Sequence, residues 1–360
     1  MTSIPNTRED LSPKWFTSVL KLAGDNHVES VELQTLGEAD SVSGDIYRVK
    51  IKYSNKTPDT PESVVVKLPR PRSLRTPMLL DAYRQEVGFY RNLAHKVGVP
   101  VPKHIYSDID PATYDYVLVI EDYPDSTNVR NEIGATIEQA YSLVQYMAKF
   151  HSKYWENPTL LEYEWLFKVD EHRIDTMTSE ITKCLPLFLS RFSQYIEPAE
   201  MEVLQALPEH YKATVKPLWF SAPPTLVHND FAMKNILIID GGLRFVLVDW
   251  ANVGLGPGVR DLSFFVETSI KPGMRSELEG SLLRHYWEKL RGEGVSGYSF
   301  QRMFDDYRRS VIIDIGRNVR FAGRDFFRPM YEPIARRAIL GRTGSAEELD
   351  LIGLIDRDRG

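Results

Sequence analysis

The sequence has very little cysteine. Cys184 stands alone among 360 residues, so no disulfide can form within the chain, and a cytoplasmic protein is the simpler expectation. No motif surrounds this residue, which favours a packed thiol over a nucleophile. Basic charge is not in excess either, because 44 Lys and Arg residues are outnumbered by 50 Asp and Glu residues, for a net charge of −6. This balance argues against nucleic acid as the main partner.

Long apolar runs are missing as well. No stretch of about 18 apolar residues occurs, so we expect no membrane span, and the N-terminus lacks the apolar run after a basic start that marks a secretory signal. The sequence contains no internal repeat and no low-complexity tract. Its composition is that of an ordinary globular protein, 42% hydrophobic and 26% charged. At about 150 residues per domain, its length predicts two domains.

The first third of the chain predicts a small sheet with helices. The alternation and valine content of strands occur in five segments, at 28–36, 46–53, 63–68, 103–107 and 115–121. Ser12-Pro13 is typical of a helix start and predicts a short helix to about Ala23. A second helix is expected from about Thr76 to His95.

Helical patterns dominate after Tyr123. Thr136 and Gln139 form a capping-box signature that opens a long helix. Later helices are expected near 259–270, 274–291 and 299–321, and short apolar strands at 225–227, 236–239 and 245–248. The sequence therefore predicts an α+β protein with a sheet-rich lobe at 1–122 and a larger, mostly helical lobe at 123–360.

The candidate chemistry lies in residues 226–265. An apolar strand leads into H-x-D-x-x-x-x-N, which contains His228, Asp230 and Asn235, and a second apolar strand leads into Asp249. Phosphoryl transfer requires positioning and charge compensation, and Mg²⁺ bound to oxygen ligands supplies the compensation. Asn235 and Asp249 are candidate ligands for that ion. Asp230 is the candidate acceptor of the proton from a substrate hydroxyl.

This segment resembles the catalytic core of the aminoglycoside phosphotransferase and choline kinase superfamily, whose members are distant relatives of protein kinases. The resemblance implies a two-lobed protein-kinase-like fold, with an antiparallel sheet in the small lobe, and ATP and Mg²⁺ as cofactors. It implies that Asp230 is the catalytic aspartate, that Asn235 and Asp249 bind magnesium, and that His228 braces the loop. The family usually has glycine where this chain has Asn229.

The N-terminal part fits the same resemblance. Lys67 ends the VVVK run of an expected strand, and Glu86 follows nineteen residues later on an expected helix. The resemblance implies that Lys67 is the lysine that holds the nucleotide phosphates and that Glu86 is its ion-pair partner. Residues 36–48 lie between two strands, where a loop containing Gly37 and Gly44 would cover the phosphates through backbone N–H groups. These glycines do not complete a G-x-G-x-x-G motif, and an ordinary hairpin is the alternative.

The resemblance implies two further sets of functional residues, one at the hinge and one at a helix start. Glu121 and Tyr123 follow the VLVI strand, where the kinase hinge meets adenine through its backbone. Asp261 resembles the aspartate at a helix start that steadies the catalytic loop through backbone hydrogen bonds. The helix dipole also favours a carboxylate at that position, and the two interpretations are compatible.

The short spacing after Asp249 restricts the acceptor. Asp261 follows only twelve positions after it, so the long activation segment and A-P-E motif of protein kinases are absent. A dense acidic run suited to aminoglycosides is not evident either. The residues EVGFY at 86–90, VIEDY at 119–123 and MAKFHSKYW at 147–155 indicate the ecdysteroid-kinase-like branch, with a resemblance over roughly residues 30 to 270. That branch phosphorylates hydroxyl groups of small molecules, steroids among them.

Aromatic and arginine residues of the large lobe are candidates for the acceptor site, although aromatic stripes at helical spacing are more often core. They are Trp165, Tyr286, Trp287, Phe304, Tyr307, Phe321, Phe326, Phe327, Arg308, Arg317 and Arg320.

The sequence therefore predicts an ATP- and Mg²⁺-dependent phosphotransferase that moves the γ-phosphate to a hydroxyl of a small molecule, such as a steroid-like compound, an antibiotic or another hydroxylated metabolite. A catalytically silent nucleotide-binding regulator on the same fold and a protein kinase are the alternatives. GTP is left open as donor, because hinge contacts use mostly backbone atoms. We expect no nucleic acid, no membrane and no obligate protein partner.

Overall fold

The computed structural model describes residues 4–36, 44–128, 133–324, 332–340, 342 and 344–358. The chain forms two compact units. Unit 1 comprises Met1–Thr127, Glu164–Leu166 and Ile239–Val253, and unit 2 comprises Asn128–Tyr163, Phe167–Ile238 and Gly254–Gly360. The division into lobes at residues 122 and 123 stays a prediction. None of the described helices is long and apolar enough to cross a membrane.

Unit 1 is built on a five-stranded antiparallel sheet, with strands in the order β1-β2-β3-β5-β4. The strands are β1 (Val28–Leu36), β2 (Gly44–Tyr53), β3 (Ser63–Pro69), β4 (His104–Asp110) and β5 (Asp115–Glu121). All five lie where the sequence predicts them. Short strand β9 (Arg244–Leu247) and the 3₁₀ turn η7 (Trp250–Asn252) also belong to this unit.

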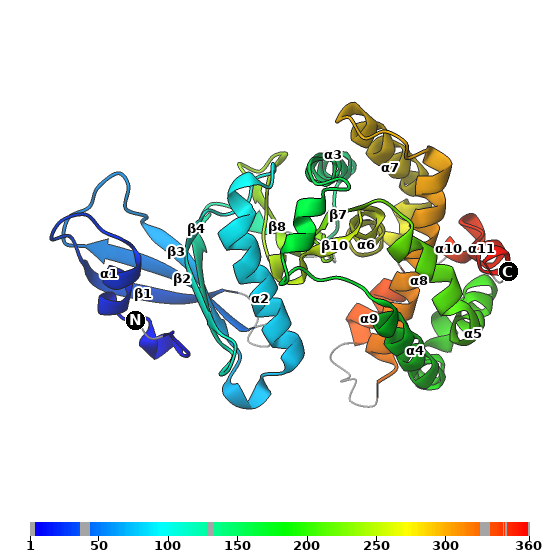
Figure 1. The fold of residues 1–360 in the computed structure, drawn as a ribbon, viewed down its shortest axis with the longest axis horizontal. Coiled ribbons are helices and arrows are strands. Elements are labelled where there is room, and N and C mark those ends of the chain that lie inside the picture. The colour runs from blue at the N-terminus through cyan, green and yellow to red at the C-terminus, as the bar shows by residue number, and fades with distance from the viewer. Residues whose placement is uncertain are drawn as a thin grey trace. The chain divides into compact units, whose positions relative to one another are not determined.

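Successive side chains of a strand point to opposite faces of this sheet, and one helix covers each face. Val64 and Val66 of β3 are buried in a core that includes Trp15 and Phe16 of α1 (Pro13–Val19). Lys67 points to the other face, which is covered by α2 (Pro77–Asn92). Figure 1 shows α1 and α2 on opposite sides of the sheet.

Helix α1 is shorter than the sequence predicts. It begins as expected, with the Ser12 hydroxyl accepting a hydrogen bond from the Trp15 N–H, but it ends at Val19 rather than near Ala23. Lys21 has a φ of 50°, and a left-handed residue cannot continue a right-handed helix. Helix α2 ends at Asn92, and the short 3₁₀ helix η3 (Ala94–Lys96) covers the rest of the helix expected there.

Unit 2 is mainly helical, as Figure 1 shows for the segments labelled α3 to α11. Its helices are α3 (Ile137–Lys153), α4 (Glu171–Phe192), α5 (Pro198–Phe220), α6 (Val259–Ser269), α7 (Pro272–Gly292), α8 (Phe300–Ala322), α9 (Glu332–Leu340), α10 (Ser345–Glu348) and α11 (Leu351–Arg357). Helix α3 packs against α7, and α8 packs against α4, α5 and α6. The capping box at Thr136 and Gln139 is confirmed, with both reciprocal bonds present.

Short strands join the helices. β7 (Pro224–Val227) pairs with β10 (Gly254–Pro257), a strand that the sequence pattern did not predict. β6 (Thr127–Asn128) and β8 (Ile236–Ile239) mark points where the chain passes from one unit to the other. The expected fold class, a small antiparallel sheet and a larger helical part, is confirmed.

Candidate functional site

Lys67 lies at the centre of a charged group in unit 1. Its Nζ atom is 2.5 Å from Oε1 of Glu86 and 2.9 Å from Oδ1 of Asp249. Lys67 and Glu86 are only 8% and 3% exposed, so water stabilises neither charge and each requires the other as its ion-pair partner. The structure thus brings together the two residues whose pairing the sequence predicts and adds Asp249 to them.

Opposing effects act on the pKa values of this group. Burial favours the neutral form of Lys67, but the carboxylates of Asp249 and Glu86 outweigh it and raise the pKa of the lysine. Burial raises the pKa of the Glu86 carboxyl, and the Lys67 ammonium acts in the opposite direction. Lys67 therefore stays protonated at physiological pH, as a group that binds an anion must.

Asp249 owes its position to a sharp turn after β9. Its backbone is left-handed, with φ 64° and ψ 61°, a conformation that aspartate tolerates better than most residues. The next residue, Trp250, is fully buried and stacks on Phe89 of α2, with ring centroids 3.9 Å apart. The stacked rings anchor this turn to the helix that carries Glu86.

Asp230 and Asn235 lie in the loop between β7 and β8 of unit 2. The Asn235 Nδ2 group donates to the Asp230 carbonyl at 2.8 Å and to Asp230 Oδ2 at 2.9 Å. Because both acceptors are oxygens, Oδ1 is the atom with which Asn235 would bind a cation. Lys234, which the sequence analysis did not single out, places its Nζ 2.9 Å from the same Oδ2.

Asp261 holds the start of this loop. Its Oδ2 accepts the N–H of His228 and its Oδ1 accepts the N–H of Asn229, each at 2.7 Å. Asp261 is fully buried in the first turn of α6, a position where acidic side chains interact favourably with the helix dipole. His228 is buried too, and its Nδ1 accepts the N–H of Asp230 at 3.3 Å. These bonds have the geometry of a brace, the role proposed for both residues.

Asn229 takes the place of the glycine that is usual in the related family. Its φ is 61°, in the left-handed region. Glycine adopts this region freely, and asparagine does so more readily than other residues with a side chain. The exchange of glycine for asparagine is therefore compatible with an unchanged loop conformation.

Sequence reasoning missed His151 and expected Tyr286 only as an acceptor candidate, whereas both extend the hydrogen bonds of Asp261. His151 of α3 has Nε2 3.2 Å from Asp261 Oδ2 and Nδ1 2.7 Å from the Tyr286 hydroxyl. All three side chains are fully buried, and burial lowers the pKa of His151 against the effect of Asp261. The signal in the sequence was a histidine one turn after Met147 on the apolar face of a helix, where a polar side chain needs a partner.

The other residues expected near the nucleotide lie in or beside the sheet of unit 1. The Tyr123 hydroxyl donates to Oε2 of the exposed Glu121 at 3.0 Å, and burial raises the pKa of Tyr123 to about 12. Gly44 opens β2 with a φ of 149°, and a Cβ there would lie 2.0 Å from the Leu68 carbonyl oxygen. Gly37 lies outside the described residues.

The acceptor candidates fall into four groups, which are core residues, ion-paired arginines, residues with accessible surface, and residues outside the described ranges. Tyr286 and Tyr307 are fully buried in unit 2, whereas Trp165 belongs to unit 1. The three arginines are paired with carboxylates: Arg308 with Asp305 and Asp350, Arg317 with Glu267, and Arg320 with Glu180. Phe326 and Phe327 lie outside the described residues. Trp287 and Phe304 are half-buried and Phe321 is exposed, so these three keep surface that a ligand could reach.

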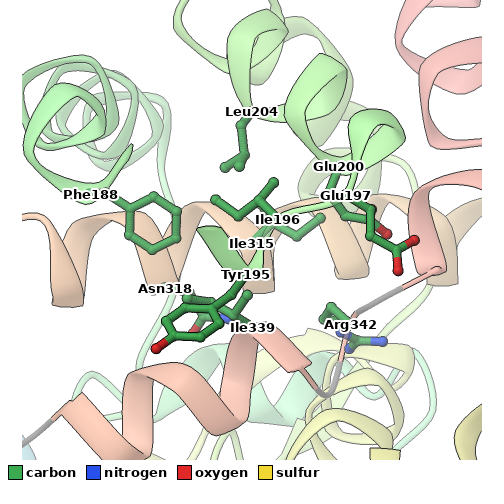
Figure 2. A pocket seen from close by; sticks show the side chains of 10 residues that line it. All are labelled: Phe188, Tyr195, Ile196, Glu197, Glu200, Leu204, Ile315, Asn318, Ile339 and Arg342. Carbon is green, nitrogen blue, oxygen red and sulfur yellow. The ribbon is translucent and has the colours of Figure 1, made fainter. Parts of the chain in front are cut away.

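A small cavity lies among the helices of unit 2. Figure 2 shows Phe188 on one side of it and Glu197, Glu200 and Arg342 on the other. Its volume is about 40 Å³, which suits water rather than a drug-sized ligand. It shares no residue with the groups around Lys67, Asp230 or Asp261.

Within the described ranges, no cluster of three or more His, Cys, Asp or Glu residues could hold a metal. Magnesium does not require such a cluster, because it usually takes one or two protein oxygens and completes its shell with water and substrate phosphates. Asn235 and Asp249 supply ligand atoms of the right type, so the residues present fit this ion.

Comparisons with known proteins add to this geometry. A profile of the ecdysteroid kinase-like family matches residues 38–293. A search of curated protein sequences finds no match.

Solved structures share the fold at low sequence identity. Choline kinase from Cryptosporidium parvum Iowa II has a TM-score of 0.57 at 12% identity, over 92% of this chain and 94% of that chain. ADP-bound aminoglycoside phosphotransferase APH(2'')-Ib has a TM-score of 0.52 at 16% identity, over 88% and 94%. The microcompartment-associated aminopropanol kinase has a TM-score of 0.51 at 13% identity, over 92% and 94%. The expected kinase-like fold is confirmed.

Proposed function

This chain belongs to the ecdysteroid kinase-like family, and from that premise we propose that it transfers the γ-phosphate of ATP to a hydroxyl group of a small molecule. The observation that carries the proposal is the ion-paired group of Lys67, Glu86 and Asp249. A buried lysine between two carboxylates is costly to maintain, and phosphate binding is a function that explains it.

We assign a task to every residue of the proposed site. Lys67 binds the nucleotide phosphates, and Glu86 holds the lysine in place. Asn235 and Asp249 would hold Mg²⁺, which when bound compensates the charge of the transferred phosphoryl group. Asp230 accepts the proton of the acceptor hydroxyl, and Asn235 fixes the orientation of its carboxylate. Asp261 and His228 keep the loop in shape.

We propose a small, neutral or amphipathic alcohol as the acceptor. The short spacing between Asp249 and Asp261 leaves no room for a peptide-docking segment. The similar structures named above are kinases of aminoglycosides, choline and aminopropanol, which are all small molecules. A cytoplasmic location stays a prediction.

An ATP-consumption screen against sterols, sugars, choline, aminoglycosides and other hydroxylated metabolites tests the proposal. We expect transfer to at least one acceptor, and we expect Asp230→Asn to lower kcat by about 100-fold or more while nucleotide affinity is kept. The matched control is Asp240→Asn, which changes an exposed aspartate ten positions later in the sequence that pairs with Arg244. Full turnover by the Asp230 variant would refute the assignment of the base. ATP binding without transfer to any acceptor would favour the silent regulator.

A further inference from the structure

Tyr116 shares the buried face of the sheet with Lys67. Lys67 of β3 lies directly opposite Leu118 of β5, and directly opposed residues of neighbouring strands point to the same face. Tyr116 is two residues before Leu118 on the same strand, so it also points towards α2. It is fully buried, at 1% exposure.

The hydroxyl of Tyr116 binds the residue that pairs with Lys67. It donates to Oε2 of Glu86 at 2.7 Å, while the Lys67 ammonium takes Oε1 of the same carboxylate at 2.5 Å. The two donors therefore use different oxygens of Glu86. Without the tyrosine hydroxyl, Oε2 would be a buried carboxylate oxygen that has lost its donor, which is an expensive state.

Helix α2 holds Tyr116 at a second point. The ring of Tyr83, one turn before Glu86, stacks on the Tyr116 ring with centroids 4.4 Å apart and planes 6° from parallel. The phenol is thus fixed by stacking and its hydroxyl by Glu86. Movement of α2 away from β5 would break both contacts together.

We propose that Tyr116 is a positioning residue for catalysis, which holds the Glu86 carboxylate in the orientation that places Lys67 at the nucleotide phosphates. This inference rests on the proposed function, since it concerns the same lysine. It adds that the position of Glu86 is set by strand β5 as well as by its own helix.

A comparison of two tyrosine variants tests this role. Tyr116→Phe removes the hydroxyl that binds Glu86. Tyr90→Phe is the matched control, because Tyr90 is equally buried, lies on α2, and its hydroxyl has no hydrogen-bond partner among the described residues. We expect Y116F to lower kcat/KM for ATP by about ten-fold, the effect of one hydrogen bond to a charged group, and to leave KM for the acceptor unchanged. Y90F should match the wild type.

The pH profile separates positioning from a general loss of stability. The Tyr116 hydroxyl stabilises the charged form of Glu86, so its removal raises the pKa of that carboxyl. Because Glu86 holds Lys67 only when it is ionised, the acid limb of kcat/KM for ATP should move to higher pH in Y116F. It should stay in place in Y90F.

A double-mutant cycle closes the test. In the Glu86→Gln background, Y116F should cause no further loss in kcat/KM for ATP, because the hydroxyl acts through the carboxylate. The comparison of Glu86→Gln with the double variant can be made even if the single Y116F variant does not fold. Equal activity and equal pH profiles of Y116F and Y90F would overturn the inference, as would a full further loss in the Gln background. If the wild-type protein transfers no phosphate at all, the proposed function fails instead. The nucleotide affinities of the same variants then test the inference separately, because Lys67 is proposed to bind the nucleotide phosphates.

Discussion

Single residues set the shape of the loop that carries Asp230. Asn229 is left-handed at φ 61°, and its N–H is bound by Asp261. The sequence alone marked this residue as a departure from the related family, and its backbone angle explains why asparagine is accepted. The same reasoning applies to Asp249, whose left-handed backbone ends β9 and turns its carboxylate towards Lys67.

A pair of variants at Asn229 measures this conformational requirement. Asn229→Gly and Asn229→Ala both remove the amide, but only alanine has a Cβ that opposes the left-handed backbone. We expect N229A to be less stable than N229G by about 1 kcal/mol and to have the lower kcat. Urea unfolding and steady-state kinetics are the measurements. An alanine variant that equals the glycine variant in both would show that the backbone angle is not important.

At the scale of elements, α2 is the helix that organises the charged group of unit 1. It carries Glu86, its Phe89 stacks on Trp250, and its Gly88 lies against Trp165. A glycine inside a helix costs stability, so this one needs a reason. The indole supplies it, because a Cβ at Gly88 would lie 2.2 Å from the ring.

Two helix glycines give a matched test of this packing. Gly88→Ala should destabilise the protein by about 1–3 kcal/mol, since the close contact with Trp165 outweighs the better helix propensity of alanine. Gly280→Ala in α7 is the control, because a Cβ there meets nothing within 4 Å, and we expect a gain of about 0.5–1 kcal/mol. Thermal or urea unfolding reports both. Opposite signs are the prediction, and equal signs would contradict it.

At the scale of the whole molecule, ligand binding should change stability. A ligand that binds only the folded chain raises the free energy of unfolding by about 2.7 kcal/mol at 100 times its Kd. We expect ATP with Mg²⁺ to raise the melting temperature more than ATP with a chelator. Asp249→Asn should remove most of the difference, because it loses a carboxylate ligand of the ion. A melting temperature unaffected by Mg²⁺ in the wild type would contradict the metal assignment.

Much of the architecture could be read locally from the chain. The five strands of unit 1 and the later helices follow from alternation, helical period and caps, which are properties of neighbouring residues. The ends of helices were harder to predict where the backbone conformation of a single residue sets them, as the left-handed Lys21 does just after α1. Strand β10 was missed because Gly254–Pro257 contains two glycines and a proline and has no strand pattern of its own.

The spacing of His228, Asp230, Asn235 and Asp249 was enough to predict phosphate chemistry, because each residue type is one that a phosphotransferase needs. The partners of these residues were not predictable in the same way. Tyr116 and His151 are ordinary core residues by sequence, and Tyr286 was expected only as an acceptor candidate. They acquire their roles through hydrogen bonds to residues 30, 110 and 135 positions away along the chain. Such pairings are set by how strands and helices pack, and a buried polar atom must then find its partner wherever the fold places one.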